Sequence, residues 1–128
     1  MPSPATATPH RIFSYAGCST CRKALAWLNA QGLHPGQDLL VIDITLTPPD
    51  EADLRRALNQ LGRPRLFNTS GQSYRALGAA AIKALSDDDA IAALAADGRL
   101  VKRPFLITAR GAVVTGFKPE EWLPLLAP

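Results

Sequence analysis

Apolar and polar positions along this chain follow two periods, one typical of strands and one typical of helices. Residues 10–15 form a short apolar run that predicts a first strand. Residues 18–31 place apolar side chains at i, i+3, i+4 and i+7, which predicts a helix, and Gly32 is expected to end it. A β-branched run within residues 38–45 predicts a second, buried strand. These segments predict a strand–helix–strand unit with a right-handed crossover.

The middle of the chain has a helical pattern. Helices are expected at residues 51–61, at residues 74–85 with an interruption at Gly78, and at residues 90–96 after a cap at Ser86, with Gly62 and Gly98 ending the first and the last of them. Residues 67–71 are expected to form a loop.

The last third of the chain predicts two more strands and a helix. Residues 104–108 and 112–115 flank a turn at Arg110-Gly111 and predict a β-hairpin, and residues 119–126 predict a short helix. The order of elements predicts an α/β, thioredoxin-like fold: a mixed four-stranded sheet with a helical insertion in its middle. We expect residues 1–9 to be a disordered tail and residues 10–128 to be one domain.

Composition narrows the class of protein. The chain has 128 residues, of which 47% are apolar and 20% charged, as in a globular protein with one domain. The net charge of +3 comes from 14 basic and 11 acidic residues that are mixed along the chain, so no direct nucleic-acid contact is expected. No signal peptide and no apolar stretch of about 20 residues is evident, which predicts a cytoplasmic protein without membrane contact.

Cys18 and Cys21 are the only cysteines, and they lie where the first strand meets the first helix. Free N–H groups at a helix N-terminus favour a thiolate, and a second thiol three residues on lies within range of a disulfide. Cys21 shares the apolar stripe of the helix, so it should be the buried, resolving thiol. Cys18 should be exposed and attack first.

Two other interpretations of the cysteine pair are open. The two side chains could be small buried hydrophobic groups. They could also be half of a metal site, but this would need two more ligands, and only His10 and His34 remain, in predicted loops. We therefore expect no metal. Ser19 and Thr20 are expected to cap the helix, and the Thr20 hydroxyl could assist a thiolate.

Several segments together resemble the ArsC-type arsenate reductase family, which includes the Spx transcription regulators and a YffB-like branch. They are Cys-x-x-Cys-Arg-Lys within residues 15–24, together with residues 46–49, 66–69, 74–78 and 102–104. The resemblance runs from about residue 10 to residue 126. Asn68-Thr69 with Tyr74-Arg75 is most similar to the YffB-like branch.

The resemblance implies roles for individual residues. Cys18 matches the nucleophile, and Cys21 matches the second cysteine of the Spx-type redox switch. Arg103 matches an arginine that helps to bind an oxyanion, although by itself it could equally be a surface arginine, and Pro104 matches a cis proline beside the active cysteine. We expect Thr20, Arg22 and Pro104 to contribute to substrate binding. Arg22 could instead project into solvent.

The chain also departs from the family pattern. Arsenate reductases of this family carry further arginines in the segments that correspond to residues 66–70 and 115–117, and neither segment has one here. Arg103, with Arg22 or Lys102, and the helix N-terminus would be left to hold the oxyanion. The missing arginines weaken the expectation of arsenate reduction.

The sequence thus predicts a thiol/disulfide oxidoreductase related to the glutaredoxin-dependent arsenate reductases. No bound cofactor is expected, and the electrons would come from glutathione, a glutaredoxin or a thioredoxin. The alternative is an Spx-like regulator that binds the α subunit of RNA polymerase and whose activity depends on a Cys18–Cys21 disulfide.

Overall fold

The computed structural model describes residues 8–126, so most of the tail expected at residues 1–9 lies outside the described part. Its elements in chain order are β1 (His10–Ser14), α1 (Ser19–Ala30), β2 (Leu39–Asp43), α2 (Glu51–Leu61), the 3-10 turn η2 (Arg63–Arg65), α3 (Gln72–Leu77), α4 (Ala79–Ala84), α5 (Asp87–Ala96), the 3-10 turn η3 (Gly98–Leu100), β3 (Phe105–Ile107), β4 (Val113–Thr115) and α6 (Pro119–Leu126). Gly78 separates α3 from α4 with a φ of 89°.

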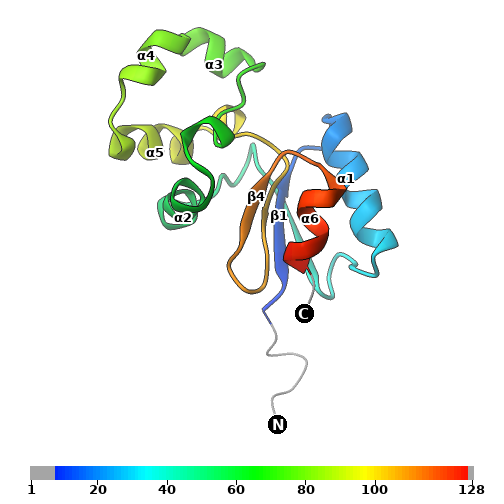
Figure 1. Ribbon diagram of the computed structural model, residues 1–128. Helices are drawn as coiled ribbons and strands as arrows, with labels where there is room; N and C mark the ends of the chain where they lie inside the picture. The colour runs from blue at the N-terminus through cyan, green and yellow to red at the C-terminus, as the bar shows by residue number, and fades with distance from the viewer. Residues whose placement is uncertain (1–7, 127–128) are drawn as a thin grey trace.

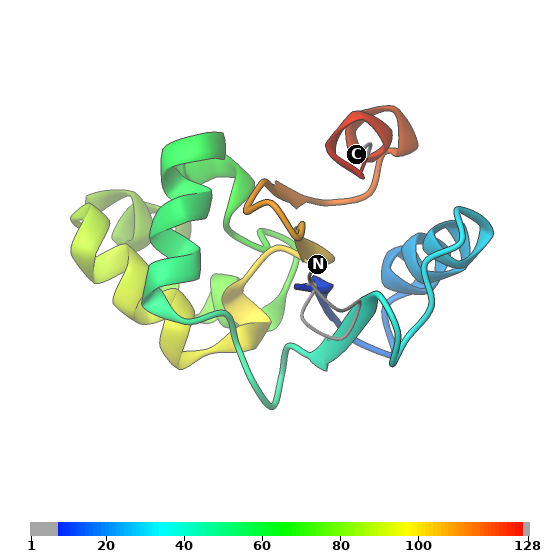
Figure 2. The same cartoon turned by 90° about the horizontal axis from the view of Figure 1, so that it is seen from below.

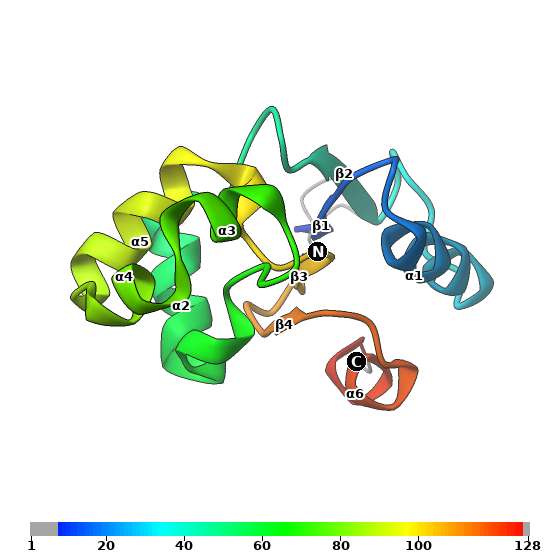
Figure 3. The same cartoon turned by 90° about the horizontal axis from the view of Figure 1, so that it is seen from above.

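The four strands form one mixed sheet, which confirms the predicted fold. Their order is β2-β1-β3-β4; β1 runs parallel to β2 and antiparallel to β3, and β3 pairs antiparallel with β4. Helices α1 and α6 cover one face of the sheet, and the helical insertion α2–α5 covers the other (Figures 1, 2 and 3). No helix within residues 8–126 is long and apolar enough to cross a membrane.

Each face of the sheet has its own hydrophobic core. On the insertion side, Phe13 and Phe105 of the sheet meet edge to face and join the buried side chains of α2 and α5. On the other side, α1 and α6 pack on Ile12, and the Trp122 ring lies against Trp27 with ring centroids 6.3 Å apart. Because both cores end at β1, the end of this strand is held from two sides, and that is where the cysteines lie.

The prediction that the second strand is buried is wrong. Only Leu39 is buried among the first three residues of β2, whereas Leu40 and Val41 are 47% and 37% exposed. The apolar run is genuine, but β2 is an edge strand with one neighbour, β1. Run length alone cannot distinguish a central strand from an edge strand.

Gly98 has a different role from the predicted one. Helix α5 ends at Ala96 with Asp97 as its cap, and Gly98 begins η3 instead. A Cβ atom on Gly98 would lie 1.7 Å from the carbonyl oxygen of Ile44. Glycine is therefore needed because two backbone segments touch here, after β2 and before β3.

Replacing Gly98 by alanine is expected to lower the free energy of unfolding by about 2–3 kcal/mol, since the new methyl group must displace backbone. Gly71→Ala is the matched control: its Cβ would lie 2.7 Å from Nδ2 of the Asn68 side chain, which can move, and 3.6 Å from the Arg99 carbonyl oxygen, an ordinary van der Waals contact. Urea unfolding of both variants measures the difference. If the two variants have equal free energies of unfolding, the close contact with Ile44 does not require glycine at position 98.

Candidate functional site

Cys18 is the N-cap of helix α1. Its backbone is extended, with φ −96° and ψ 115°, and its Sγ accepts a hydrogen bond from the backbone N–H of Cys21 at 3.3 Å. The prediction that Ser19 and Thr20 cap the helix is wrong, because both residues already lie in its first turn. The cap is thus a sulfur atom that points toward free N–H groups, and both cysteines are in the reduced form.

The two thiols differ in burial, as the apolar stripe predicted. Cys18 is partly exposed, whereas Cys21 is fully buried on the α1 face that also buries Ala24 and Leu28. A disulfide substrate can therefore reach Cys18 directly. It cannot reach Cys21 unless the helix moves.

The two thiols also differ in pKa. Burial by itself would raise the pKa of Cys18, but hydrogen bonding from Cys21 and the nearby Arg103 guanidinium outweigh it, so that this pKa is lowered. Burial, followed by the adjacent Cys18, raises the pKa of Cys21 to about 12. Cys18 therefore ionises before Cys21, which is the arrangement of a nucleophile and a resolving thiol.

Arg103 reaches the cysteines from the segment before β3. The peptide bond between Arg103 and Pro104 is cis, as the family resemblance implied. The guanidinium carbon lies 5.1 Å from the centre of the Tyr15 ring, a cation–π contact that holds the side chain near the start of α1. Arg103 also lines two cavities.

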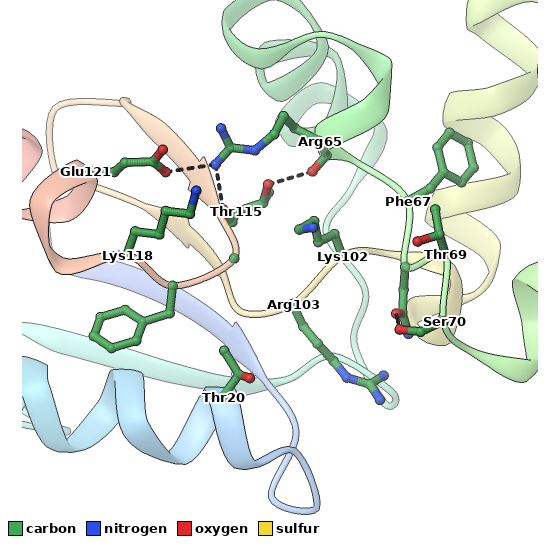
Figure 4. Close-up of a pocket in the computed structure, with 13 residues that line it drawn as sticks. Thr20, Arg65, Phe67, Thr69, Ser70, Lys102, Arg103, Thr115, Lys118 and Glu121 are labelled. Carbon is green, nitrogen blue, oxygen red and sulfur yellow. Dashed lines mark hydrogen bonds and ion pairs between the residues drawn. The ribbon is translucent and has the colours of Figure 1, made fainter.

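The larger of these cavities has a volume of about 450 Å³ and opens beside the first turn of α1, where Thr20 lines it (Figure 4). Its walls come from the start of α1, the segment after η2, the segment before β3 and the link from β4 to α6. The residues that line it are Thr20, Arg65, Phe67, Asn68, Thr69, Ser70, Lys102, Arg103, Thr115, Gly116, Phe117, Lys118 and Glu121. Most of this lining is polar or charged, and cations outnumber carboxylates.

The predicted site residues fall into two groups. Thr20 and Arg103 line the cavity, next to the cysteines. Arg22 and Pro104 do not: Arg22 is exposed and donates to the carbonyl of Ala16 at 2.7 Å, which braces the loop before Cys18. Pro104 is buried, and its carbonyl accepts from the N–H of Gly116 at 3.0 Å. The structure thus gives Arg22 and Pro104 a role in positioning backbone and places neither in the cavity.

Both segments that lack the expected arginines face this cavity, since residues 68–70 and 115–117 all line it. Three cations that the sequence analysis did not assign together to a site occupy the same space: Arg65, Lys102 and Lys118. Their positions in the sequence are far apart and do not indicate that they share a cavity. Only the folded sheet brings the end of η2, the start of β3 and the start of α6 to one place. Residues 8–126 contain no group of three or more His, Cys, Asp or Glu side chains able to hold a metal ion.

Comparisons with known proteins agree with this geometry. The model of the ArsC family matches residues 13–125. The Bacillus subtilis protein YusI is 36% identical over 114 residues, which cover 87% of this chain and 92% of YusI.

Solved structures extend the likeness to the whole fold. An arsenate reductase from Vibrio cholerae superposes with a TM-score of 0.76 at 30% identity, covering 94% of this chain and 100% of that one. A protein named YffB superposes with a TM-score of 0.74 at 28% identity, covering 92% and 99% of the two chains. The residues that the family model matches include Cys18, Cys21 and Arg103.

Proposed function

Because this chain belongs to the ArsC family, a family of thiol oxidoreductases, we propose that it catalyses thiol–disulfide exchange with Cys18 as the nucleophile and Cys21 as the resolving thiol. The observation that carries the proposal is the capped, partly exposed Cys18 sulfur with a buried thiol one turn behind it. A thiolate, not a thiol, attacks disulfides.

The reaction has two exchange steps. The Cys18 thiolate attacks one sulfur of a disulfide substrate, a Cys18 mixed disulfide forms, and the other half leaves as a thiolate. Cys21 then loses its proton to a departing thiolate or to water and attacks the Cys18 sulfur. The second half of the substrate leaves, and a Cys18–Cys21 disulfide remains. The protein gives up two electrons, and two molecules of glutathione, or a glutaredoxin or thioredoxin, return them.

The raised pKa of Cys21, due first to burial and then to Cys18, fits this order of events. Once Cys18 is in a mixed disulfide, its sulfur is neutral and the part of the shift due to Cys18 is gone. Cys21 is therefore easier to deprotonate at the stage at which it must attack. Before that stage it stays protonated and does not compete with Cys18.

Glutathione is the proposed reductant, and a glutathione mixed disulfide is the proposed type of substrate. Arsenate is a weaker candidate, because residues 68–70 and 115–117 supply no guanidinium to the cavity that they line. Planar guanidinium groups are the side chains best suited to bind a tetrahedral oxyanion through two hydrogen bonds.

The deciding assay supplies wild-type protein with excess glutathione and, in separate reactions, the mixed disulfide of glutathione and 2-mercaptoethanol or arsenate. We expect turnover of the disulfide and, without glutathione, a protein that has lost two thiols to an internal disulfide. Arsenate should be reduced far more slowly, if at all. Rapid arsenate reduction without turnover of the disulfide would contradict the proposal.

The same cysteine pair also supports the alternative function, an Spx-like transcription regulator. It is tested by capture of the RNA polymerase α subunit on the oxidised and on the reduced protein. Binding in one redox state, together with no turnover of any disulfide, would favour the regulator. Turnover without binding favours the oxidoreductase.

A further inference from the structure

Tyr15 lies in the loop before Cys18, and the exchange reaction proposed above gives it no role. It follows β1 directly and is 39% exposed. Among the described residues, its ring belongs to neither of the two hydrophobic cores, so packing of the fold does not account for it. Both its backbone and its ring nevertheless contact groups that act in the reaction.

The backbone of Tyr15 shapes the loop that carries the nucleophile. Its carbonyl accepts a hydrogen bond from the N–H of Cys18 at 3.0 Å, which closes a turn over Ala16 and Gly17. Burial raises the pKa of Cys21, and a backbone hydrogen bond with Tyr15 opposes that rise. The main chain of Tyr15 is thus held in a fixed position relative to both thiols.

The ring of Tyr15 lies against two neighbours. A Cβ atom on Gly17 would lie 2.7 Å from Cε2 of the ring, so glycine at position 17 leaves the space that the ring occupies. The guanidinium carbon of Arg103 lies 5.1 Å from the ring centre, within the range of a cation–π contact. The ring therefore offers Arg103 a surface whose position is set by the Cys18 loop.

Arg103 has no acidic partner that would hold its side chain. No carboxylate within residues 8–126 forms an ion pair with it. Its side chain extends away from Arg65 and Lys118 (Figure 4), and with Tyr15 it lines the smaller cavity of about 220 Å³. A long side chain without such a partner has many rotamers. Contact with the Tyr15 ring favours one of them.

We propose that Tyr15 is a positioning residue for disulfide exchange, whose ring holds the Arg103 guanidinium where it stabilises the Cys18 thiolate. The inference rests on the proposed function and adds how the reactivity of the nucleophile is set. A guanidinium that stacks on an aromatic face keeps the N–H groups at its edge free to interact with an anion. Tyr15 thus acts on Cys18 through Arg103.

The groups around Cys18 give the sign of the expected effect. Burial raises the pKa of Cys18, and interactions with Cys21 on α1 and with Arg103 before β3 lower it. The Arg22 guanidinium donates to the carbonyl of Ala16 instead. When the ring no longer holds Arg103, less of this lowering remains, so the pKa of Cys18 rises and less thiolate is present below it.

The test uses iodoacetamide, which alkylates the Cys18 thiolate with loss of iodide, and follows the rate against pH. We expect Tyr15→Leu to raise the pH midpoint by about half a unit, which corresponds to an about threefold lower rate below the midpoint. Tyr15→Phe keeps the ring without its hydroxyl and should match the wild type. A trifluorinated phenylalanine at position 15 keeps the shape of the ring but removes the negative charge of its face, so it should behave like Tyr15→Leu.

A double variant separates an effect through Arg103 from a change in the loop. In an Arg103→Met background, Tyr15→Leu should move the midpoint no further, because the ring then has no cation to hold. A shift of equal size in both backgrounds would overturn the inference. So would equal midpoints for Tyr15→Phe and its trifluorinated form, a comparison that does not depend on the folding of Tyr15→Leu. If the wild type reduces no disulfide, the proposed function fails, and the alkylation rates still decide the role of Tyr15.

Discussion

Serine in place of Cys18 is expected to abolish disulfide turnover, with kcat/KM falling by at least about 1,000-fold. A serine hydroxyl is not ionised at neutral pH, and Cys21 cannot substitute because it is fully buried and its pKa is raised, first by burial, to about 12. The measurement is reduction of the mixed disulfide of glutathione and 2-mercaptoethanol in the presence of glutathione. Equal rates for the variant and the wild type would refute the role of Cys18.

Cys21→Ser is the matched variant, because it removes the other sulfur and leaves the nucleophile. It should still attack the disulfide and then accumulate protein with one glutathione attached at Cys18, visible as a single mass adduct. Serine at position 18 should give no adduct. An adduct on Cys18→Ser and none on Cys21→Ser would reverse the assigned roles.

Methionine in place of Arg103 is expected to lower kcat/KM for disulfide reduction by about 100-fold, because the loss removes a charged group that both favours the Cys18 thiolate and lines the cavity. The sign of the pH effect follows from the charge. Burial raises the pKa of Cys18, and interactions with Cys21 and Arg103 lower it, so loss of the cation moves this pKa upward. The variant should therefore recover part of its activity as the pH rises.

The rate of Cys18 alkylation by iodoacetamide, followed against pH, measures this shift directly. Arg110→Met serves as the control, since Arg110 is an exposed arginine at the turn of the hairpin. A pH midpoint that moves in Arg110→Met as much as in Arg103→Met would mean that overall charge, and not the local guanidinium, sets the reactivity of Cys18.

Most helices and strands could be predicted from the sequence because caps and hydrophobic periodicity depend on residues close together in the chain. Pro48-Pro49-Asp50 fixes the start of α2, where the Asp50 side chain accepts from the N–H of Asp53, and Ser86 caps α5 in the same manner. The stripe that buries Cys21 and exposes Cys18 was likewise readable from helical periodicity.

Features that depend on distant segments were not readable in this way. Gly98 looks like a helix terminator until Ile44 is seen against it, and β2 looks buried until the sheet order makes it an edge. Lys118 looks like any exposed lysine before a helix. It becomes part of a site because β3, β4 and α6 bring it to the wall of the cavity that Thr20 and Arg103 also line.

The cysteine cap of α1 also couples the chemistry to the backbone. The amide hydrogen of Cys21 is held by the Cys18 sulfur, and a sulfur in a disulfide is a poorer acceptor than a thiolate. Each round of the proposed disulfide exchange should therefore loosen and restore the first turn of α1. Amide hydrogen exchange at Cys21, slow in the reduced protein and faster in the oxidised one, would report the redox state without any label on the thiols.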